Sequence, residues 1–187
     1  MSEKQVVITG FGGQGIVLTG NILGKAATIF DGRHATMTQN YGPEARGGSC
    51  SSQVIVSETD IAFPYVEHPQ VLVCMSQEGY EKNAPSLRAG GMIVWDSDLV
   101  KVGQMDPSWT TLNVPATRIA EELGNRMMAN IVMLGFLSAV SDVVSVEALR
   151  QAMLASVPPK TKETNAKAFD KGRAHGLEQA PAAGGQG

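Results

Sequence analysis

The stretch ITGFGGQGIVLTG, residues 8–20, decides how this chain folds. It joins a short β-branched run, QVVIT (5–9), to a segment with apolar residues at helical spacing, which predicts a helix over 14–30. The run RHATMTQ (33–39) predicts a second strand after that helix. The order of strand, glycine turn, helix and strand indicates a βαβ unit, as at the beginning of a doubly wound sheet.

Three glycines of this stretch match the fingerprint of dinucleotide-binding proteins. Gly10, Gly12 and Gly15 form G-x-G-x-x-G, a pattern that is informative only when its surroundings agree. A dinucleotide site also needs a carboxylate for the ribose where the second strand ends. Asp31 has the right spacing but precedes that strand, and residues 38–40 (Thr-Gln-Asn) contain no carboxylate. The surroundings therefore argue against a nicotinamide or flavin site.

The glycine turn leaves two interpretations open. Small residues allow backbone N–H groups and a helix N-terminus to point at an anion, which suits a phosphate group. Alternatively, the glycines only permit tight packing between the strand and the helix.

The rest of the chain continues the alternation of strands and helices. Further strands are predicted over 51–58, 71–75, 91–96 and 109–114, and further helices over 76–90 (broken), 115–124, 125–140, 145–157 and 160–176. This pattern predicts an α/β fold with three layers, a Rossmann-like, mainly parallel sheet and a helical C-terminal third. We expect one domain over 1–176 and a disordered tail over 177–187.

The composition limits the classes of function. The chain has 187 residues and a formal net charge of −3, so no basic field indicates nucleic-acid binding. We expect a cytoplasmic protein, because no signal peptide or membrane-spanning run is visible. Cys50 and Cys74 lie in apolar contexts and are expected to be buried thiols, too few for an iron–sulfur cluster. His34, His68 and His175 have no metal-ligand spacing, so no metal site is expected.

A second irregular segment, YGPEARGGS (41–49), concentrates polar side chains among backbone-shaping residues. Pro43 stiffens the turn, while Gly47 and Gly48 permit unusual dihedral angles or the close approach of a partner. If the second strand ends near Gln39, this loop leaves the same sheet edge as the glycine turn. Doubly wound folds bind ligands at this edge, so we expect the two loops to form one crevice.

These motifs together resemble one family. The matching segments are GFGGQGIVLTGNILGKAA (10–27), YGPEARGGSCSSQVIVS (41–57), HPQVLVCMSQEGYEKN (68–83), NIVMLGFLSAV (130–140) and VPPKTKETNAKAFDKG (157–172). The chain is similar along nearly its whole length to the gamma subunit of the 2-oxoacid:ferredoxin oxidoreductases. That subunit is equivalent to one fused domain of pyruvate:ferredoxin oxidoreductase.

The resemblance implies a non-autonomous enzyme subunit. Members of the family decarboxylate a 2-oxoacid oxidatively to its acyl-coenzyme A and reduce ferredoxin. The general character of the separate gamma chain favours 2-oxoglutarate as the substrate over pyruvate or branched-chain oxoacids. The isolated chain is expected to be inactive. The implied partners are alpha, beta and delta-type subunits, which would hold thiamine diphosphate, Mg²⁺ and the 4Fe–4S clusters, with ferredoxin binding through the complex.

The resemblance also suggests a role in binding coenzyme A, which has phosphates suited to the glycine turn. The residues expected to contact coenzyme A or another anion are Gly12, Gly13, Gln14, Gly15 and Arg46. Those expected at the subunit interface are Tyr41, Gly42, Pro43, Glu44, Gly47 and Gly48, and no catalytic residue is expected. Two alternatives stay open: a free-standing nucleotide-dependent oxidoreductase domain, and a purely structural assembly subunit.

Overall fold

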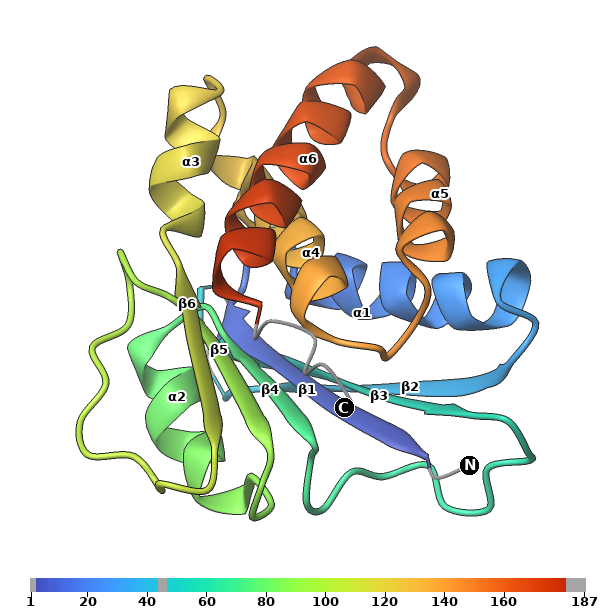
Figure 1. The fold of residues 1–187 in the computed structure, drawn as a ribbon, viewed down its shortest axis with the longest axis vertical. Helices are drawn as coiled ribbons and strands as arrows, with labels where there is room; N and C mark the ends of the chain where they lie inside the picture. Colours follow the sequence, from blue (N-terminus) through green and yellow to red (C-terminus); the bar gives the residue numbers. More distant parts are fainter. Residues whose placement is uncertain (1–2, 44–46, 181–187) are drawn as a thin grey trace, which may run out of the picture.

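The computed structural model describes residues 3–43 and 47–180, which form a six-stranded sheet between two unequal helical layers (Figure 1). The strands are β1 (Lys4–Phe11), β2 (His34–Tyr41), β3 (Ser49–Ser57), β4 (Val71–Cys74), β5 (Met92–Asp96) and β6 (Thr110–Val114). The α-helices are α1 (Ile16–Lys25), α2 (Gln77–Asn83), α3 (Ala116–Glu122), α4 (Ala129–Val140), α5 (Val146–Ser156) and α6 (Lys162–Gln179). The predicted three-layer α/β class is confirmed.

The sheet is mostly parallel, as predicted, but its second strand is not where a doubly wound fold places it. The order is β2-β3-β1-β4-β5-β6, and β1, β4, β5 and β6 pair in parallel. Strand β3 lies between β1 and β2 and runs antiparallel to both. The expectation of an adjacent β1 and β2 is therefore wrong, because β3 turns back after β2 and fills the place beside β1.

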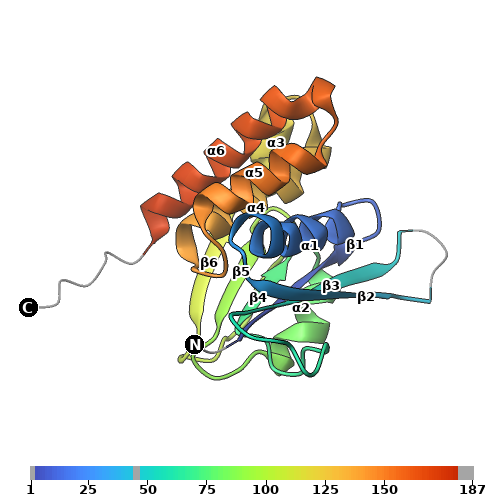
Figure 2. The ribbon, with the colours of Figure 1, turned by 90° about the vertical axis from the view of Figure 1, so that its right-hand side faces the viewer.

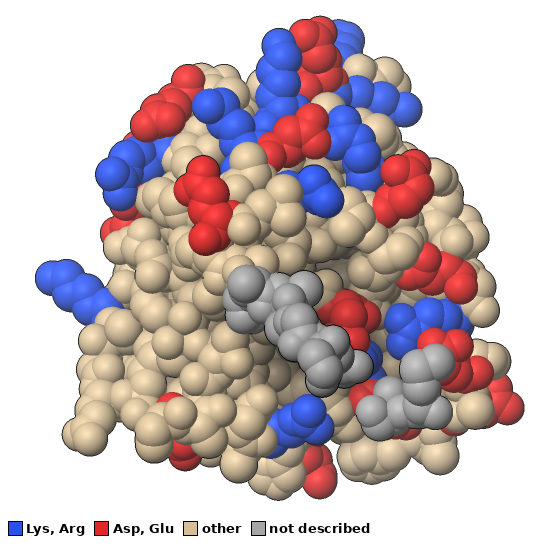
Figure 3. All heavy atoms as spheres, viewed as in Figure 1, with Lys and Arg blue, Asp and Glu red and all other residues tan. Residues whose placement is uncertain are grey.

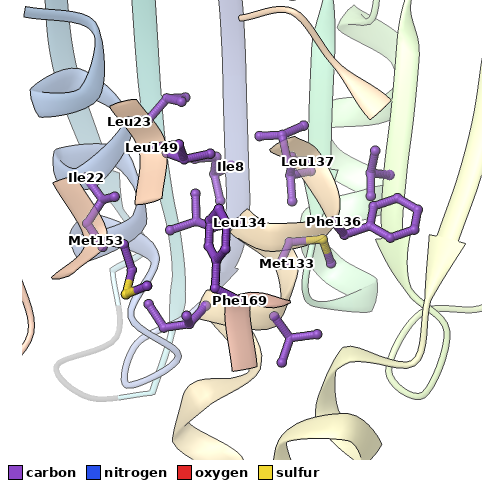
Figure 4. Packing of buried hydrophobic residues seen from close by; sticks show 14 of the residues in the cluster. Ile8, Ile22, Leu23, Met133, Leu134, Phe136, Leu137, Leu149, Met153 and Phe169 are labelled. Carbon is purple, nitrogen blue, oxygen red and sulfur yellow. The ribbon is translucent and has the colours of Figure 1, made fainter. Parts of the chain in front are cut away.

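The two faces of the sheet have separate apolar cores. The larger core lies between the sheet and helices α1, α4, α5 and α6 (Figure 2). Helix α4 lies at its centre, and Figure 4 shows Met133, Leu134 and Leu137 among side chains from β1, α1, α5 and α6. The smaller core lies under α2 and the adjoining loops, where Leu72 and Ile93 are buried. The apolar circumference of 127–140 thus marks a buried helix, as the sequence predicts.

Two glycines allow α4 and α6 to pack backbone against backbone. A Cβ added at Gly135 would overlap the carbonyl group of Phe169, and one at Gly172 would overlap that of Val132. Both positions are closer than the 3.0 Å that real Cβ atoms keep. Neither helix can therefore gain a methyl group at this crossing without moving away from the other.

Helix α6 extends further than predicted and seals one edge of the sheet. It continues to Gln179, so a disordered tail beginning at 177 is wrong for 177–179. The side-chain amide of Gln179 donates to Asn113 O at 2.7 Å, and its oxygen accepts from Asn113 N–H at 3.4 Å. The Gln179 amide thus bonds both the N–H and the C=O of Asn113 at the outer edge of β6. Residues 181–187 lie outside the described residues.

The start of α5 agrees with the sequence prediction. Ser145 is its N-cap, and the Oγ accepts from Ala148 N–H at 3.1 Å. Asp31 in turn accepts from the backbone N–H of Ser145 at 2.7 Å and from its hydroxyl at 2.6 Å. Asp31 is thus a structural residue that joins the end of the first helical segment to α5.

Charged side chains gather over the helical layer on the face shown in Figure 3, whereas the lower left of that face has few. On α6, Lys167 pairs with Glu163 at 2.8 Å, and Asp170 pairs with Arg150 of α5. Part of the charge on this helix is thus paired within the chain. Among the described residues, no helix combines the length and the apolarity needed to cross a bilayer.

Candidate functional site

The glycine turn leaves the carboxyl end of β1 and enters α1 in a conformation that requires glycine. Gly13 and Gly15 have φ angles of 92° and 73°, in the left-handed region. Gly15 is the N-cap of α1, and a Cβ there would overlap the side-chain amide of Asn130. Asn130 is 3% exposed and donates from Nδ2 to Gly15 O at 3.3 Å. The first residues of α1 and α4 therefore fix this turn from two sides.

Gln14 holds the turn to the sheet through its side chain. Its Oε1 accepts from Phe11 N–H at 2.6 Å, and its Nε2 donates to Met75 O at 2.9 Å. The side chain thereby joins the ends of β1 and β4, two neighbouring parallel strands.

The backbone N–H groups of the turn divide into two kinds. Gly12 N–H donates to Gly48 O at 2.9 Å and Gln14 N–H donates to Phe11 O at 3.1 Å, so both are used inside the chain. No described acceptor receives the N–H groups of Gly13 or Gly15. An anion at this turn would therefore meet the backbone N–H groups of Gly13 and Gly15 and those of the first turn of α1.

The second loop meets the glycine turn, as the sequence predicts. The bond from Gly12 to Gly48 joins them, and an added Cβ at Gly12 would lie 3.5 Å from Gly47 N. Gly47 has a φ angle of 69°, and Tyr41 at the start of this loop is 64% exposed. Glu44 and Arg46, expected at the interface and at an anion, lie outside the described residues.

Two hollows adjoin these loops at the carboxyl edge of the sheet. One, of about 70 Å³, lies between the turn and the start of α4, and Gly13, Thr117, Arg126 and Met127 are among its lining residues. The other, of about 190 Å³, has a polar lining that includes Lys82 of α2. A larger open cavity of about 470 Å³ lies at the opposite sheet edge, away from both loops.

Three residues at the carboxyl edge of the sheet were not predicted as site residues. Asn130 and Arg126 reach the glycine turn from the α4 end of the chain, more than 100 positions away. Asp96 stands at the carboxyl end of β5 and accepts from Thr117 N–H at 3.0 Å and from its hydroxyl at 2.6 Å. Two signals in the sequence could have pointed to them: Asn130 is a polar residue at the start of an apolar run, and Asp96 is an aspartate at the end of a strand.

The Asp96 carboxyl group is completely buried, and burial raises its pKa above the ordinary value of 3.8. The hydrogen bonds from Thr117 and from Asp98 N–H act in the opposite direction, but desolvation is the larger effect. Asp96 orders the first residues of α3 beside the glycine turn.

The raised pKa of Asp96 can be tested by measuring how the effect of Asp96→Asn on stability depends on pH. The native carboxyl has the higher pKa, so its contribution to stability is complete below the unfolded pKa and declines as pH rises through the native pKa. We expect the free energy of unfolding of the wild type, minus that of Asp96→Asn, to fall as the pH rises above the ordinary carboxyl pKa of about 4. Urea denaturation at each pH measures this difference. A difference that rises with pH would contradict the assignment.

The two cysteines are buried thiols, as the sequence predicts. Cys50 and Cys74 are free and buried, and burial raises the pKa of both thiols. His34 lies 3.2 Å from a carboxylate oxygen of Asp60 on the surface. Across residues 3–43 and 47–180, no group of three or more His, Cys, Asp or Glu side chains is placed to hold a metal ion.

Asp31 and Arg33 lie away from the glycine turn, as the sequence predicts. Both precede β2, at the sheet edge opposite the glycine turn. Arg33 donates to Val143 O at 2.7 Å and pairs with Glu58 at 2.9 Å. Neither side chain is available to a ligand at the carboxyl edge.

Comparison with known proteins agrees with this arrangement. The model of the family described as "Pyruvate ferredoxin/flavodoxin oxidoreductase" matches residues 5–175. The chain belongs to this family. Among its members, the "2-oxoglutarate synthase subunit KorC" of Methanocaldococcus jannaschii is 47% identical over 172 residues, which cover 91% of this chain and 92% of the relative.

Two solved structures have the same fold as this chain. The keto/oxoacid ferredoxin oxidoreductase gamma subunit from Geobacter sulfurreducens has a TM-score of 0.85 and 35% identity, with 95% of this chain and 98% of that chain covered. A 2-oxoglutarate:ferredoxin oxidoreductase from Magnetococcus marinus, solved with 2-oxoglutarate, coenzyme A and succinyl-CoA bound, has a TM-score of 0.88. At 22% identity, over 97% of this chain and 32% of that one, this likeness shows the fold alone.

Proposed function

We propose that this chain is the gamma subunit of a 2-oxoacid:ferredoxin oxidoreductase that acts on 2-oxoglutarate. In the assembled enzyme, 2-oxoglutarate is decarboxylated oxidatively to its acyl-coenzyme A while ferredoxin is reduced. The observation that supports this most directly is the near full-length similarity to relatives named as subunits of 2-oxoglutarate synthase. The meeting of the two irregular loops at the carboxyl edge supports a ligand crevice there.

Coenzyme A is the ligand proposed for this crevice. A protein of the same fold was solved with coenzyme A bound, and the phosphates of coenzyme A match the donors that remain at the turn. These are the N–H groups of Gly13 and Gly15 and the first turn of α1. Arg46 would supply a forked, permanently charged contact to a phosphate or to a carboxylate of a partner. Gly12 and Gln14 shape the turn, because their backbone N–H groups already donate to Gly48 O and Phe11 O.

The partner subunits are proposed to cover the same edge. Tyr41 is 64% exposed and Met127 is 61% exposed, and each lines one of the two hollows at this edge. Exposed side chains of this kind are common in protein interfaces. The proposed interface includes Tyr41, Gly42, Pro43, Glu44, Gly47 and Gly48. Thiamine diphosphate, Mg²⁺ and the iron–sulfur clusters belong to the alpha, beta and delta-type partners, since two cysteines cannot ligate a cluster.

The test of this proposal uses the assembled enzyme, because a site shared between subunits is incomplete in the isolated chain. Arg46→Ala is expected to raise the apparent KM for coenzyme A roughly tenfold through loss of a charge-assisted hydrogen bond, and to leave the KM for 2-oxoglutarate unchanged. Steady-state kinetics with each substrate varied gives both values. Arg88→Ala, an exposed arginine beside the cavity at the opposite sheet edge, is the matched control.

The outcomes separate the remaining alternatives. If Arg46→Ala changes neither subunit assembly nor the KM for coenzyme A, the role proposed for Arg46 is wrong. A purely structural subunit predicts that changes at Gly13 and Gly15 weaken assembly but never alter the acyl-transfer step. A free-standing nucleotide-dependent oxidoreductase predicts saturable NAD(P)H binding to the purified chain.

A further inference from the structure

The two edge strands of the sheet, β6 and β2, differ in whether their outward backbone groups have hydrogen-bond partners. At the β6 edge, the Gln179 side chain occupies the backbone donor and acceptor of Asn113. The opposite edge is β2, an eight-residue strand whose one partner in the sheet is β3 (Figure 1). An edge strand of this length offers a row of backbone groups to another strand.

The hydrogen-bond pattern identifies the outward backbone groups of β2. Gly42 N–H donates to Ser49 O at 2.7 Å, so these residues form a hydrogen-bonded pair of the antiparallel ladder. Such pairs alternate with pairs whose N–H and C=O groups point away from the partner strand. The outward groups therefore belong to Ala35, Met37, Gln39 and Tyr41. Within residues 3–43 and 47–180, no donor or acceptor reaches them.

The β2 edge lacks the devices that usually prevent pairing. Its sequence, HATMTQNY, contains no Lys, Arg, Asp, Glu or Pro, and its register with β3 is continuous from His34 to Tyr41 without a bulge. Natural edge strands are commonly protected by charges, prolines or bulges, or are covered. The sequence of β2 therefore permits a strand to be added.

Exposed apolar side chains lie near both ends of this edge. Ile29 and Phe30, which precede the start of β2, are 66% and 37% exposed, and Tyr41 at its end is 64% exposed. Ala35 and Met37 pack against the helix-side core, so alternation along the strand places the Tyr41 side chain on the same face. Antiparallel pairing of two such strands would bring the start of one strand beside the end of the other.

We propose that β2 pairs antiparallel with β2 of a second copy of this chain, so that the two sheets become continuous across a twofold axis. In such a pairing, residues with outward backbone groups must face each other. One register uses all four of these residues: Ala35 lies opposite Tyr41, and Met37 lies opposite Gln39. Thr38 then lies on the axis, opposite its own copy. Along the paired strands, no charges of like sign oppose each other.

A cysteine on the axis tests this register directly. Opposed residues of a non-hydrogen-bonded pair have Cα atoms about 4.5 Å apart, which a disulfide spans. Thr38→Cys in the full chain is expected to form a disulfide-linked homodimer on mild oxidation. Thr36→Cys is the matched control, because its own copy would lie four residues along the strand, about 13 Å away. The native cysteines are buried in both variants.

A second variant tests the same edge without oxidation. Gln39→Pro removes one outward N–H from each copy and leaves the bonds between β2 and β3 intact. It is expected to weaken dimerisation roughly tenfold or more by sedimentation velocity, with the thermal unfolding midpoint as a control for folding. A wild-type chain that stays monomeric, both alone and in the assembled enzyme, would overturn the proposal. So would a Thr38→Cys chain that links to a different subunit instead of its own copy.

Discussion

Gly135→Ala is expected to lower the free energy of unfolding by about 3 kcal/mol or more. The added Cβ would overlap the backbone carbonyl of Phe169, which cannot rotate away as a side chain does. Helices α4 and α6 would have to separate along a crossing that lies over the main core. Urea denaturation monitored by circular dichroism measures the loss, and Gly172→Ala is expected to act in the same way from the other helix.

Gly24→Ala is the matched control for this prediction. Gly24 lies within α1, has an ordinary negative φ and has no atom within 4 Å of an added Cβ. The methyl group therefore meets open space, and the gain in helix propensity is expected to raise the free energy of unfolding by about 0.5–1 kcal/mol. Equal effects of Gly135→Ala and Gly24→Ala would show that the backbone contact between α4 and α6 is not tight.

Gly15→Ala is expected to disturb both stability and the proposed crevice. It forces a Cβ into a left-handed conformation, at a φ angle of 73°, and against the buried amide of Asn130. The two costs together are about 2–4 kcal/mol. Because the turn moves, the KM for coenzyme A in the assembled enzyme is expected to rise as well, while the KM for 2-oxoglutarate stays the same.

Two further variants separate the conformational cost of Gly15→Ala from the steric one. Gly13→Ala has a φ angle of 92° but open space around the new Cβ, so only the conformational cost of about 1–2 kcal/mol is expected. Adding Asn130→Ala to Gly15→Ala removes the clash and isolates its energy in a double-mutant cycle. A smaller loss for Gly15→Ala than for Gly13→Ala would be incompatible with the observed contact.

The local parts of the site were predictable because their signals are local. The glycine turn and the start of α1 depend on residues within a few positions of one another. The argument against a dinucleotide site is equally local, since Asp31 stands before β2 and not after it. The meeting of the two loops followed from the rule that loops leaving the carboxyl ends of parallel-running strands share one edge of the sheet.

The parts that were not predicted depend on long-range pairing. A strand pattern shows which side chains face the core, but it does not show that β3 turns back between β1 and β2. The contact of Asn130 with Gly15 and the bonds from Thr117 to Asp96 join segments that only the folded chain brings together. The extra turn of α6 was also missed, because the amide of Gln179 is ordered by β6 and not by its own neighbours.

The position of β3 has a consequence for the order in which the chain can fold during synthesis. Strands β1 and β2 share no ladder, since β2 pairs with β3 alone and β1 pairs with β3 and β4. A nascent chain that has left the ribosome as far as Tyr41 thus has two strands and a helix but no sheet. The arrival of 49–57 supplies the partner of both strands at once. The amino-terminal part of the sheet is therefore expected to form in one step, once residues 49–57 have emerged.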